Sequence, residues 1–332
     1  MTDASVAPRA VRTGGLLKSA ASLAPLAIFL ALLLYLGVAA PSFLAPGTIA
    51  LILKQAVPNV VVCLGLATVV VAGGDDVISG GIDLSIPAIA VLAAAIVAQL
   101  TTIKGAPIAF ALAAGMGAAL IAGLVNAFLV VVVGMTPLLA TLASSSAYVG
   151  LASYVTSSRR IEVGDPFIVY LRDGSVGGAP AGVIAVFVLV LIFYFAVHRT
   201  RWGLNLQAVG GSRDAAEIAG LFASKFIAQS FVLAAIAGGV DSVFLLARGS
   251  GYAPGSEENL LLEMILATFL GAAFSPRRIV TLWGAVLGAV LVAALSIGFG
   301  SAGVDIFWTG CIKGGLILIV VASSAVSRNL NR

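Results

Sequence analysis

Six acidic residues lie inside or beside long apolar stretches of this sequence, and they are its most chemically informative side chains: Asp75, Asp76, Asp83, Asp241, Glu263 and Asp305. Carboxylates are costly in hydrocarbon, where they usually mark a solute pathway, a proton relay or a structural pair. No GxxxxGK[ST] phosphate loop, metal-ligand spacing or nucleophile elbow accompanies them. We therefore expect no catalytic residue, metal site or cofactor in this chain, and no ATP hydrolysis by it.

Asp83 has the most distinctive setting, in the segment GGIDLS between two apolar blocks. Paired glycines interrupt a helix and free backbone groups that only a cavity or protein neighbours can satisfy. Two compatible interpretations follow: the polar side chains cap the next helix, or the broken segment lines a solute route. The residues assigned to that route or its gate are Gly80, Gly81, Asp83 and Ser85.

Asp241 and Glu263 flank a short loop, which favours a local ion pair or helix cap over a proton-coupling site. Lys313 lies within the last apolar block. It could pair with one of these two acids or extend its amine toward the membrane surface. The sequence leaves its partner open.

The composition places the whole chain in a bilayer. Of its 332 residues, 61% are hydrophobic and 10% are charged, with a mean hydropathy of +1.14. The apolar blocks have the length of membrane-spanning helices, and 181–197 is apolar on every face, unlike a barrel strand. We expect an all-α integral membrane protein. Basic residues in such a protein report topology, so the net charge of +4 does not predict a nucleic-acid partner.

Ten apolar blocks predict ten transmembrane helices, at 22–40, 55–73, 84–100, 107–133, 136–154, 181–198, 224–246, 260–274, 280–298 and 306–326. They form a single transmembrane domain over 22–326, between cytoplasmic tails at 1–21 and 327–332. With both termini inside, eleven basic residues lie on the cytoplasmic side and six on the other. This asymmetry favours that orientation.

Two long polar stretches lie on opposite sides of the membrane in this topology. Residues 156–180 form an external loop, and 198–223 form the main internal segment. In the internal one, Ser212 can cap a helix, Asp214 lies in its first turn and Gly220 can end it. We expect a short amphipathic helix at about 211–221, on the cytoplasmic face.

Small residues are frequent within the predicted spans. Glycine lets helices approach closely where lipid supplies no hydrophobic drive, so we assign a packing role rather than a pathway role to Gly115, Gly117, Gly123, Gly284, Gly288, Gly310 and Gly314.

Three stretches carry a resemblance to a known family. The segment at 80–85 resembles the signature GGIDLSVG, 201–221 resembles a cytoplasmic segment with a GGN and paired alanines, and 283–299 resembles a penultimate-helix pattern. A looser match covers 136–161. The chain thus resembles permease subunits of bacterial ABC importers for ribose, xylose, arabinose, galactose and related sugars.

The resemblance implies a ten-helix bundle in the bacterial inner membrane that works with three partners: a cytoplasmic ATPase that binds ATP and magnesium, a second permease subunit, and a periplasmic solute-binding protein. It also implies a coupling helix that docks the ATPase. Carried over by position, its residues are Gly210, Gly211, Arg213, Asp214, Ala215, Ala216, Glu217, Ala219 and Gly220.

Three departures from the family pattern stand out. An insertion with two extra aspartates is present at 72–79, Pro87 follows the signature, and the family's glycine-rich loop is reduced to GAAFSPRRIV at 271–280. Such changes suit either assembly with a non-identical permease or a substrate other than ribose.

The leading hypothesis is ATP-driven import of a sugar or sugar-like polar solute. Inositol or a furanone-type signal remains an alternative solute. An ion- or proton-coupled secondary transporter is an alternative mechanism, because intramembrane carboxylates serve such carriers. A membrane enzyme or a structural scaffold is a third class, and the absent catalytic patterns argue against the enzyme.

Overall fold

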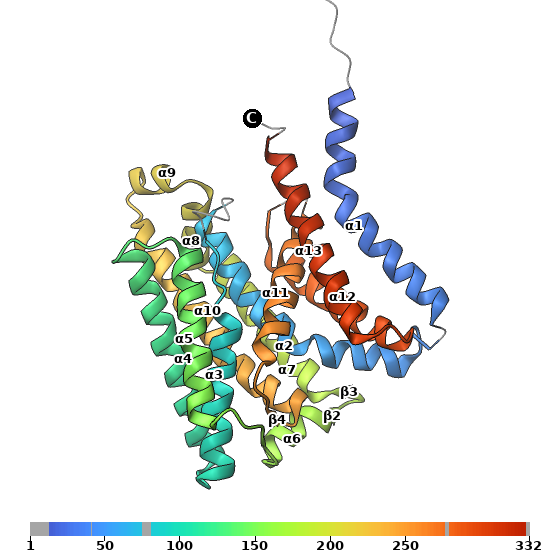
Figure 1. Ribbon diagram of the computed structural model, residues 1–332. Coiled ribbons are helices and arrows are strands. Elements are labelled where there is room, and N and C mark those ends of the chain that lie inside the picture. The colour runs from blue at the N-terminus through green and yellow to red at the C-terminus, as the bar shows by residue number, and fades with distance from the viewer. Residues whose placement is uncertain (1–12, 41, 75–80, 276–278, 330–332) are drawn as a thin grey trace, which may run out of the picture.

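The computed structural model describes residues 13–40, 42–74, 81–275 and 279–329, and most of this is helical (Figure 1). The longer helices are α1 (Thr13–Ala39), α2 (Pro46–Gly73), α3 (Ile86–Ala98) with its π-helical extension η1 (Gln99–Ile103), α4 (Ile108–Val131), α5 (Pro137–Thr156), α7 (Ala181–Arg199), α10 (Ala223–Gly249), α11 (Ser256–Ala272), α12 (Leu282–Ser301) and α13 (Ile306–Asn329). The shorter ones are α6 (Pro166–Asp173), α8 (Arg201–Gly211) and α9 (Arg213–Ile218). The predicted all-α class is confirmed.

Proline marks where several helices begin. α2 starts at Pro46, α5 at Pro137 and α6 at Pro166. Its fixed φ suits the first turn, where no intrahelical partner for the missing N–H is needed. α3 begins at Ile86 with Pro87 in its first turn, as the Ile-Pro pair predicts.

Seven helices in the described part of the chain are long and apolar enough to cross a bilayer: α2, α3 with η1, α4, α5, α7, α10 and α12. The other three predicted spans also coincide with helices. α11 has 17 residues, and the apolar parts of α1 and α13 are Leu26–Ala39 and Trp308–Ile319. The chain is a multi-pass membrane protein, while the number of ten crossings stays a prediction.

The core forms around α2 and α10. α10 packs against α2, α3 and α4, while α11 and α12 pack against α2 and against each other. The apolar segment of α2 is 83% buried, whereas that of α4 is 28% buried. α2 therefore lies at the centre of the bundle, whereas α4 lies at its periphery with most of its residues not buried by the rest of the protein.

Glycines bring these helices into contact, as the sequence predicts for four of the seven singled out. A Cβ at Gly123 would meet α10 at Ala235, and one at Gly288 would meet the carbonyl oxygen of Ala267 in α11. Gly115 and Gly284 are equally enclosed. The packing role is wrong for Gly117, Gly310 and Gly314, where a Cβ would find nothing within 4 Å.

The polar segments gather at two ends of the bundle (Figure 1). One end, at the top of the view, holds α8 and α9, the start of α1 and the end of α13. The other end holds α6 and the four short strands β1 (Ile161–Glu162), β2 (Ser175–Val176), β3 (Ala179–Pro180) and β4 (Gly251–Tyr252). We call these the coupling end and the strand end. Segments predicted to share one side of the membrane share one end of the molecule.

The predicted external loop at 156–180 is more ordered than a loop, since it contains α6 and three strands. β1 pairs antiparallel with β4, with Ile161 opposite Tyr252, and β2 pairs with β3. The turn between β2 and β3 is made by two glycines with positive φ, 59° at Gly177 and 84° at Gly178, as a tight hairpin requires.

Candidate functional site

The glycine-broken segment between α2 and α3 is the first candidate site. Gly80 and residues 75–79 of the predicted insertion lie outside the described residues. Gly81 is fully enclosed: a Cβ there would collide with the carbonyl oxygen of Val69 and the backbone of Gly73. Only glycine therefore lets this segment lie so close to the end of α2.

Asp83 makes a compact turn with Ser85 at the start of α3. Its Oδ1 accepts a hydrogen bond from the Ser85 amide at 2.8 Å and one from the Ser85 hydroxyl at 2.6 Å. Ser85 occupies the N-cap position but makes no side-chain cap. The predicted capping role of these side chains is wrong in this form, because no amide of the first turn donates to Ser85 Oγ, which accepts from Asn126 Nδ2 instead.

The turn is anchored to α4 and α5 by buried polar contacts. Asn126 donates its Nδ2 to Ser85 Oγ at 2.7 Å, and Tyr148 donates its hydroxyl to Asn126 Oδ1 at 3.2 Å. The amide of Leu84 donates to Thr141 Oγ1 at 3.1 Å. We call Asp83, Ser85, Asn126, Thr141 and Tyr148 the signature cluster. The signature cluster joins the turn that precedes α3 to α4 and α5 at one point.

The signature cluster lies inside the protein. Asp83, Ser85, Asn126 and Thr141 have no exposed surface, and Asp83 Oδ2 has no hydrogen-bond partner among the described residues. In this conformation, Asp83 is held in a packed junction between helices. A role in the solute route, through movement of that junction, stays a prediction.

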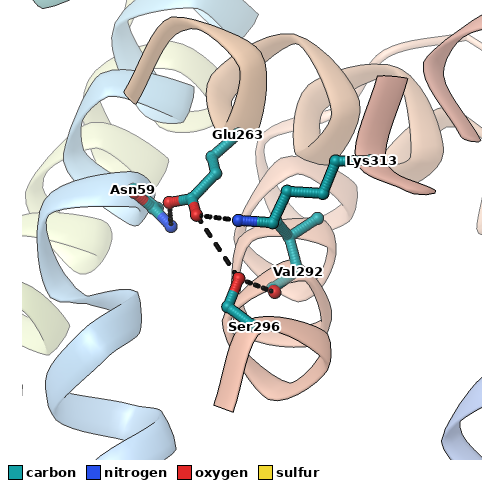
Figure 2. A network of polar contacts seen from close by, with 5 residues as sticks. All are labelled: Asn59, Glu263, Val292, Ser296 and Lys313. Carbon is teal, nitrogen blue, oxygen red and sulfur yellow. Dashed lines mark hydrogen bonds and ion pairs between the residues drawn. The ribbon is translucent and has the colours of Figure 1, made fainter. Parts of the chain in front are cut away.

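A second buried cluster joins four helices around Glu263 of α11 (Figure 2). Lys313 of α13 forms an ion pair with Glu263 Oε1 at 2.5 Å, and Asn59 of α2 donates to Oε2 at 2.6 Å. Ser296 Oγ of α12 lies 3.3 Å from Oε1 and 3.0 Å from the carbonyl oxygen of Val292, two acceptors that share its single hydroxyl hydrogen. We call Asn59, Glu263, Ser296 and Lys313 the four-helix cluster.

The four-helix cluster settles which acid Lys313 pairs with. The predicted local partner for Glu263 is wrong, since its cation comes from 50 positions along the chain. Asp241 is fully buried, and neither of its carboxylate oxygens has a hydrogen-bond partner among the described residues. The two acids look alike in the sequence, but Glu263 has an ion-pair partner and hydrogen bonds, whereas the Asp241 carboxylate has no hydrogen-bond partner among the described residues.

The predicted cytoplasmic helix is present at the coupling end as α9. Ser212 Oγ accepts a hydrogen bond from the Ala215 amide at 3.3 Å, which is the expected N-cap. Gly220 has φ of 82°, and the Leu221 amide donates to the carbonyl oxygen of Ala216 at 2.9 Å. This left-handed glycine ends the helix where the sequence predicts.

The nine predicted coupling residues have two kinds of environment. Gly210, in the last turn of α8, lies against α2, where a Cβ would collide with the carbonyl oxygen of Val71. Ala216 is buried. The other seven are exposed: Gly211, Arg213, Asp214, Ala215, Glu217, Ala219 and Gly220. The α8–α9 segment is thus packed against α2 at Gly210, while most of its predicted coupling residues are exposed.

Large apolar side chains stand out beside these polar ones. Ile218 is 89% exposed and Phe222 is 76% exposed. Exposed apolar side chains at the polar end of a membrane bundle mark contact with another protein or with the membrane surface. Sequence reasoning missed both residues, although an apolar pair at the end of a short polar helix was visible in the printed sequence.

Contacts at the strand end join three segments that the sequence places outside. Arg160 Nη2 donates to the carbonyl oxygen of Gly249 at 2.6 Å, and Arg172 Nη1 donates to Ser250 Oγ at 2.8 Å. Thr102 of η1 donates to the carbonyl oxygen of Glu162 at 2.8 Å. The strand end is therefore a connected surface built from distant parts of the chain.

Sequence reasoning missed five members of the two buried clusters: Asn59, Asn126, Thr141, Tyr148 and Ser296. Each is a polar residue within an apolar block. An amide buried in a membrane bundle is costly without a partner, so the two asparagines were a usable signal. Attention to charged residues alone left them out.

Comparison with known proteins adds the chain's family. Residues 49–321 match the family model described as the permease component of branched-chain amino acid transport systems. No solved structure matches the chain.

Curated relatives match over most of their length. A probable ABC transporter permease of Sinorhizobium fredii is 30% identical, over 98% of this chain and 96% of the relative. The fructose import permease of Rhizobium meliloti is 27% identical over 92% and 86%, and the ribose import permease of Bacillus subtilis is 28% identical over 85% and 85%. The family match, these relatives and the helical membrane bundle together show that the chain belongs to this permease family, as a membrane-spanning subunit of an ABC importer.

Proposed function

We propose that this permease subunit moves a sugar or sugar-like polar solute across the bacterial inner membrane, with both of its termini in the cytoplasm. One observation carries the proposal: in a chain of this family, the α8–α9 segment packs against α2 and exposes most of its predicted coupling residues. Sugar permeases among the relatives, for ribose, fructose, arabinose and galactofuranose, support the choice of solute. Inositol or a furanone-type signal is the alternative within the same mechanism.

Three partners follow from this function. A cytoplasmic ATPase binds ATP and magnesium and docks on the coupling end. A second permease subunit, of the same or a homologous chain, completes the pathway, and a periplasmic solute-binding protein delivers the solute to the strand end. This chain itself contributes neither a catalytic residue nor a cofactor.

The mechanism transmits force through packed helices. Movement of α9 by the ATPase would pass through α8 to the end of α2, because Gly210 lies directly against it. That end of α2 leads into the glycine-broken segment and the signature cluster. Rearrangement there would change the relation of α3, α4 and α5, and so open one side of the bundle while closing the other.

Transport by the reconstituted complex tests the proposal. The chain is placed in liposomes with its ATPase and loaded binding protein, and labelled ribose and fructose are supplied at the binding-protein side. We expect uptake that requires ATP and survives collapse of the proton gradient. Uptake without ATP, or none with any of the candidate solutes, would refute it.

One observation favours the alternative of a proton-coupled secondary transporter. The four-helix cluster contains a buried Glu and Lys pair, and such a pair could exchange a proton. The same liposomes separate the two mechanisms. A proton-coupled carrier would accumulate solute from an imposed proton gradient without the ATPase, and would lose this activity in Glu263→Gln.

A further inference from the structure

A cavity of about 220 Å³ lies between α2, α6, α7 and α10, near the strand end. This is room for a small polar molecule and far more than a single water needs. Its walls include the apolar side chains Leu51, Val57, Val183 and Phe244. None of its lining residues belongs to the signature cluster, the four-helix cluster or the coupling end.

The charged groups of the cavity are mainly cationic. Lys54 of α2, Arg172 of α6 and Arg248 of α10 all line it, and the one acidic lining residue is Asp173. Asp173 is already occupied, because its Oδ2 forms an ion pair with Arg172 Nε at 2.8 Å. Three cations against one acid leave an excess of two positive charges.

Arg248 lines this cavity with part of its hydrogen-bonding capacity unused. Its Nη1 is enclosed and has no hydrogen-bond partner among the described residues, although an enclosed guanidinium nitrogen normally has one. Asp241 lies on the same face of α10, two helical turns earlier, and attracts Arg248 electrostatically. Even when that attraction is counted against Arg248, the cation of Lys54 remains uncompensated.

We propose that this cavity binds a phosphate group carried on a small apolar or polyol moiety. A guanidinium offers paired N–H donors that match phosphate oxygens, and a lysine adds a point charge. The apolar walls suit the carbon skeleton of such a ligand. Two sources share this chemistry: the headgroup of an anionic phospholipid, and a free phosphate ester.

Native mass spectrometry of the purified full chain in neutral detergent tests the proposal with both sources. The probes are phosphatidylglycerol, phosphatidylethanolamine and glycerol 1-phosphate. We expect one tightly bound copy of either phosphatidylglycerol or glycerol 1-phosphate. Loss of a charge-assisted hydrogen bond in Arg248→Gln should weaken this binding at least about tenfold, and Lys54→Gln should weaken it as well.

Two matched variants serve as controls. Arg159→Gln and Lys104→Gln remove exposed cations outside the cavity and should leave binding unchanged. Lys54 is itself exposed, so Lys54→Gln carries the test if Arg248→Gln fails to fold, as judged by its elution in size-exclusion chromatography.

The outcomes separate the sources. Preference for phosphatidylglycerol that Lys54→Gln removes identifies a lipid site, and the same result with glycerol 1-phosphate identifies a site for a free ester. Equal binding of phosphatidylglycerol and phosphatidylethanolamine without ester binding would overturn the proposal. So would binding that the cavity variants and the two controls weaken to the same degree.

Discussion

Lys313 and Glu263 show how strongly one buried ion pair depends on both of its members, since the residues are 8% and 5% exposed. Removal of one member leaves a buried charge uncompensated, which costs about 3–5 kcal/mol. We therefore expect Lys313→Met to lower the free energy of unfolding by about that amount. Denaturation in detergent, followed by tryptophan fluorescence, measures it.

The double variant Lys313→Met with Glu263→Leu is the critical comparison. Replacing both charges by apolar groups removes the uncompensated carboxylate, so most of the lost stability should return. Lys104→Met, at an exposed lysine, should change stability by no more than about 0.5 kcal/mol. A double variant as unstable as the single one would mean that the pair is not what holds these helices.

Asp83 belongs to the residue scale as well, because its two hydrogen bonds to Ser85 shape the turn before α3. We expect Asp83→Ala to reduce solute uptake more than it reduces the amount of protein in the membrane. Asp83→Asn retains an oxygen acceptor and should keep more uptake. Transport assays normalised to immunoblots measure both.

Ser146→Ala, at an exposed hydroxyl of α5, is the control for Asp83 and should leave uptake unchanged. Equal losses of uptake and of protein in Asp83→Ala would leave only a structural role for this residue. The proposed role of the signature cluster in movement would then be wrong.

At the scale of the element, the short helix α9 matters because of the side chains exposed on it and just after it. Ile218 and Phe222 present apolar surface at the coupling end. Ile218→Asp should prevent the ATPase from co-purifying with the permease, because a charge cannot replace apolar contact at a protein interface. Pull-down with a tagged ATPase, at equal permease levels, measures this effect.

Val176→Asp is matched to Ile218→Asp. It also introduces a charge at an exposed apolar residue, 53% exposed, but in β2 at the strand end. We expect normal recovery of the ATPase with this control. Equal recovery with both variants would show that the ATPase docks elsewhere.

The sequence predicts the helices well because the bilayer imposes a length and a composition on each one. It also predicts α9, since Ser212 and Gly220 carry local signals for its start and end. Contacts between distant helices are not encoded locally. Nothing near Glu263 indicates that its cation is Lys313, or that Ser85 would bond to Asp83 and Asn126.

On the scale of the whole molecule, the strand end and the coupling end differ in the contacts that hold each of them together. The strand end is connected by backbone pairing between β1 and β4 and by arginine contacts. The coupling end carries α8 and α9 on α2. These two different ends suit the proposed function, in which the solute is delivered to the strand end and the ATPase docks on the coupling end.

The orientation of these ends is the last prediction, and single introduced cysteines make it testable. In a variant without Cys63 and Cys311, we introduce Val176→Cys at the strand end or Ala215→Cys in α9, both at exposed positions. A membrane-impermeant maleimide applied to intact cells whose outer membrane is permeable to it should label Val176→Cys only. After disruption of the inner membrane, Ala215→Cys should react as well. The reverse pattern would place the coupling end outside, where no ATPase could reach α9, and would contradict the proposed mechanism of import.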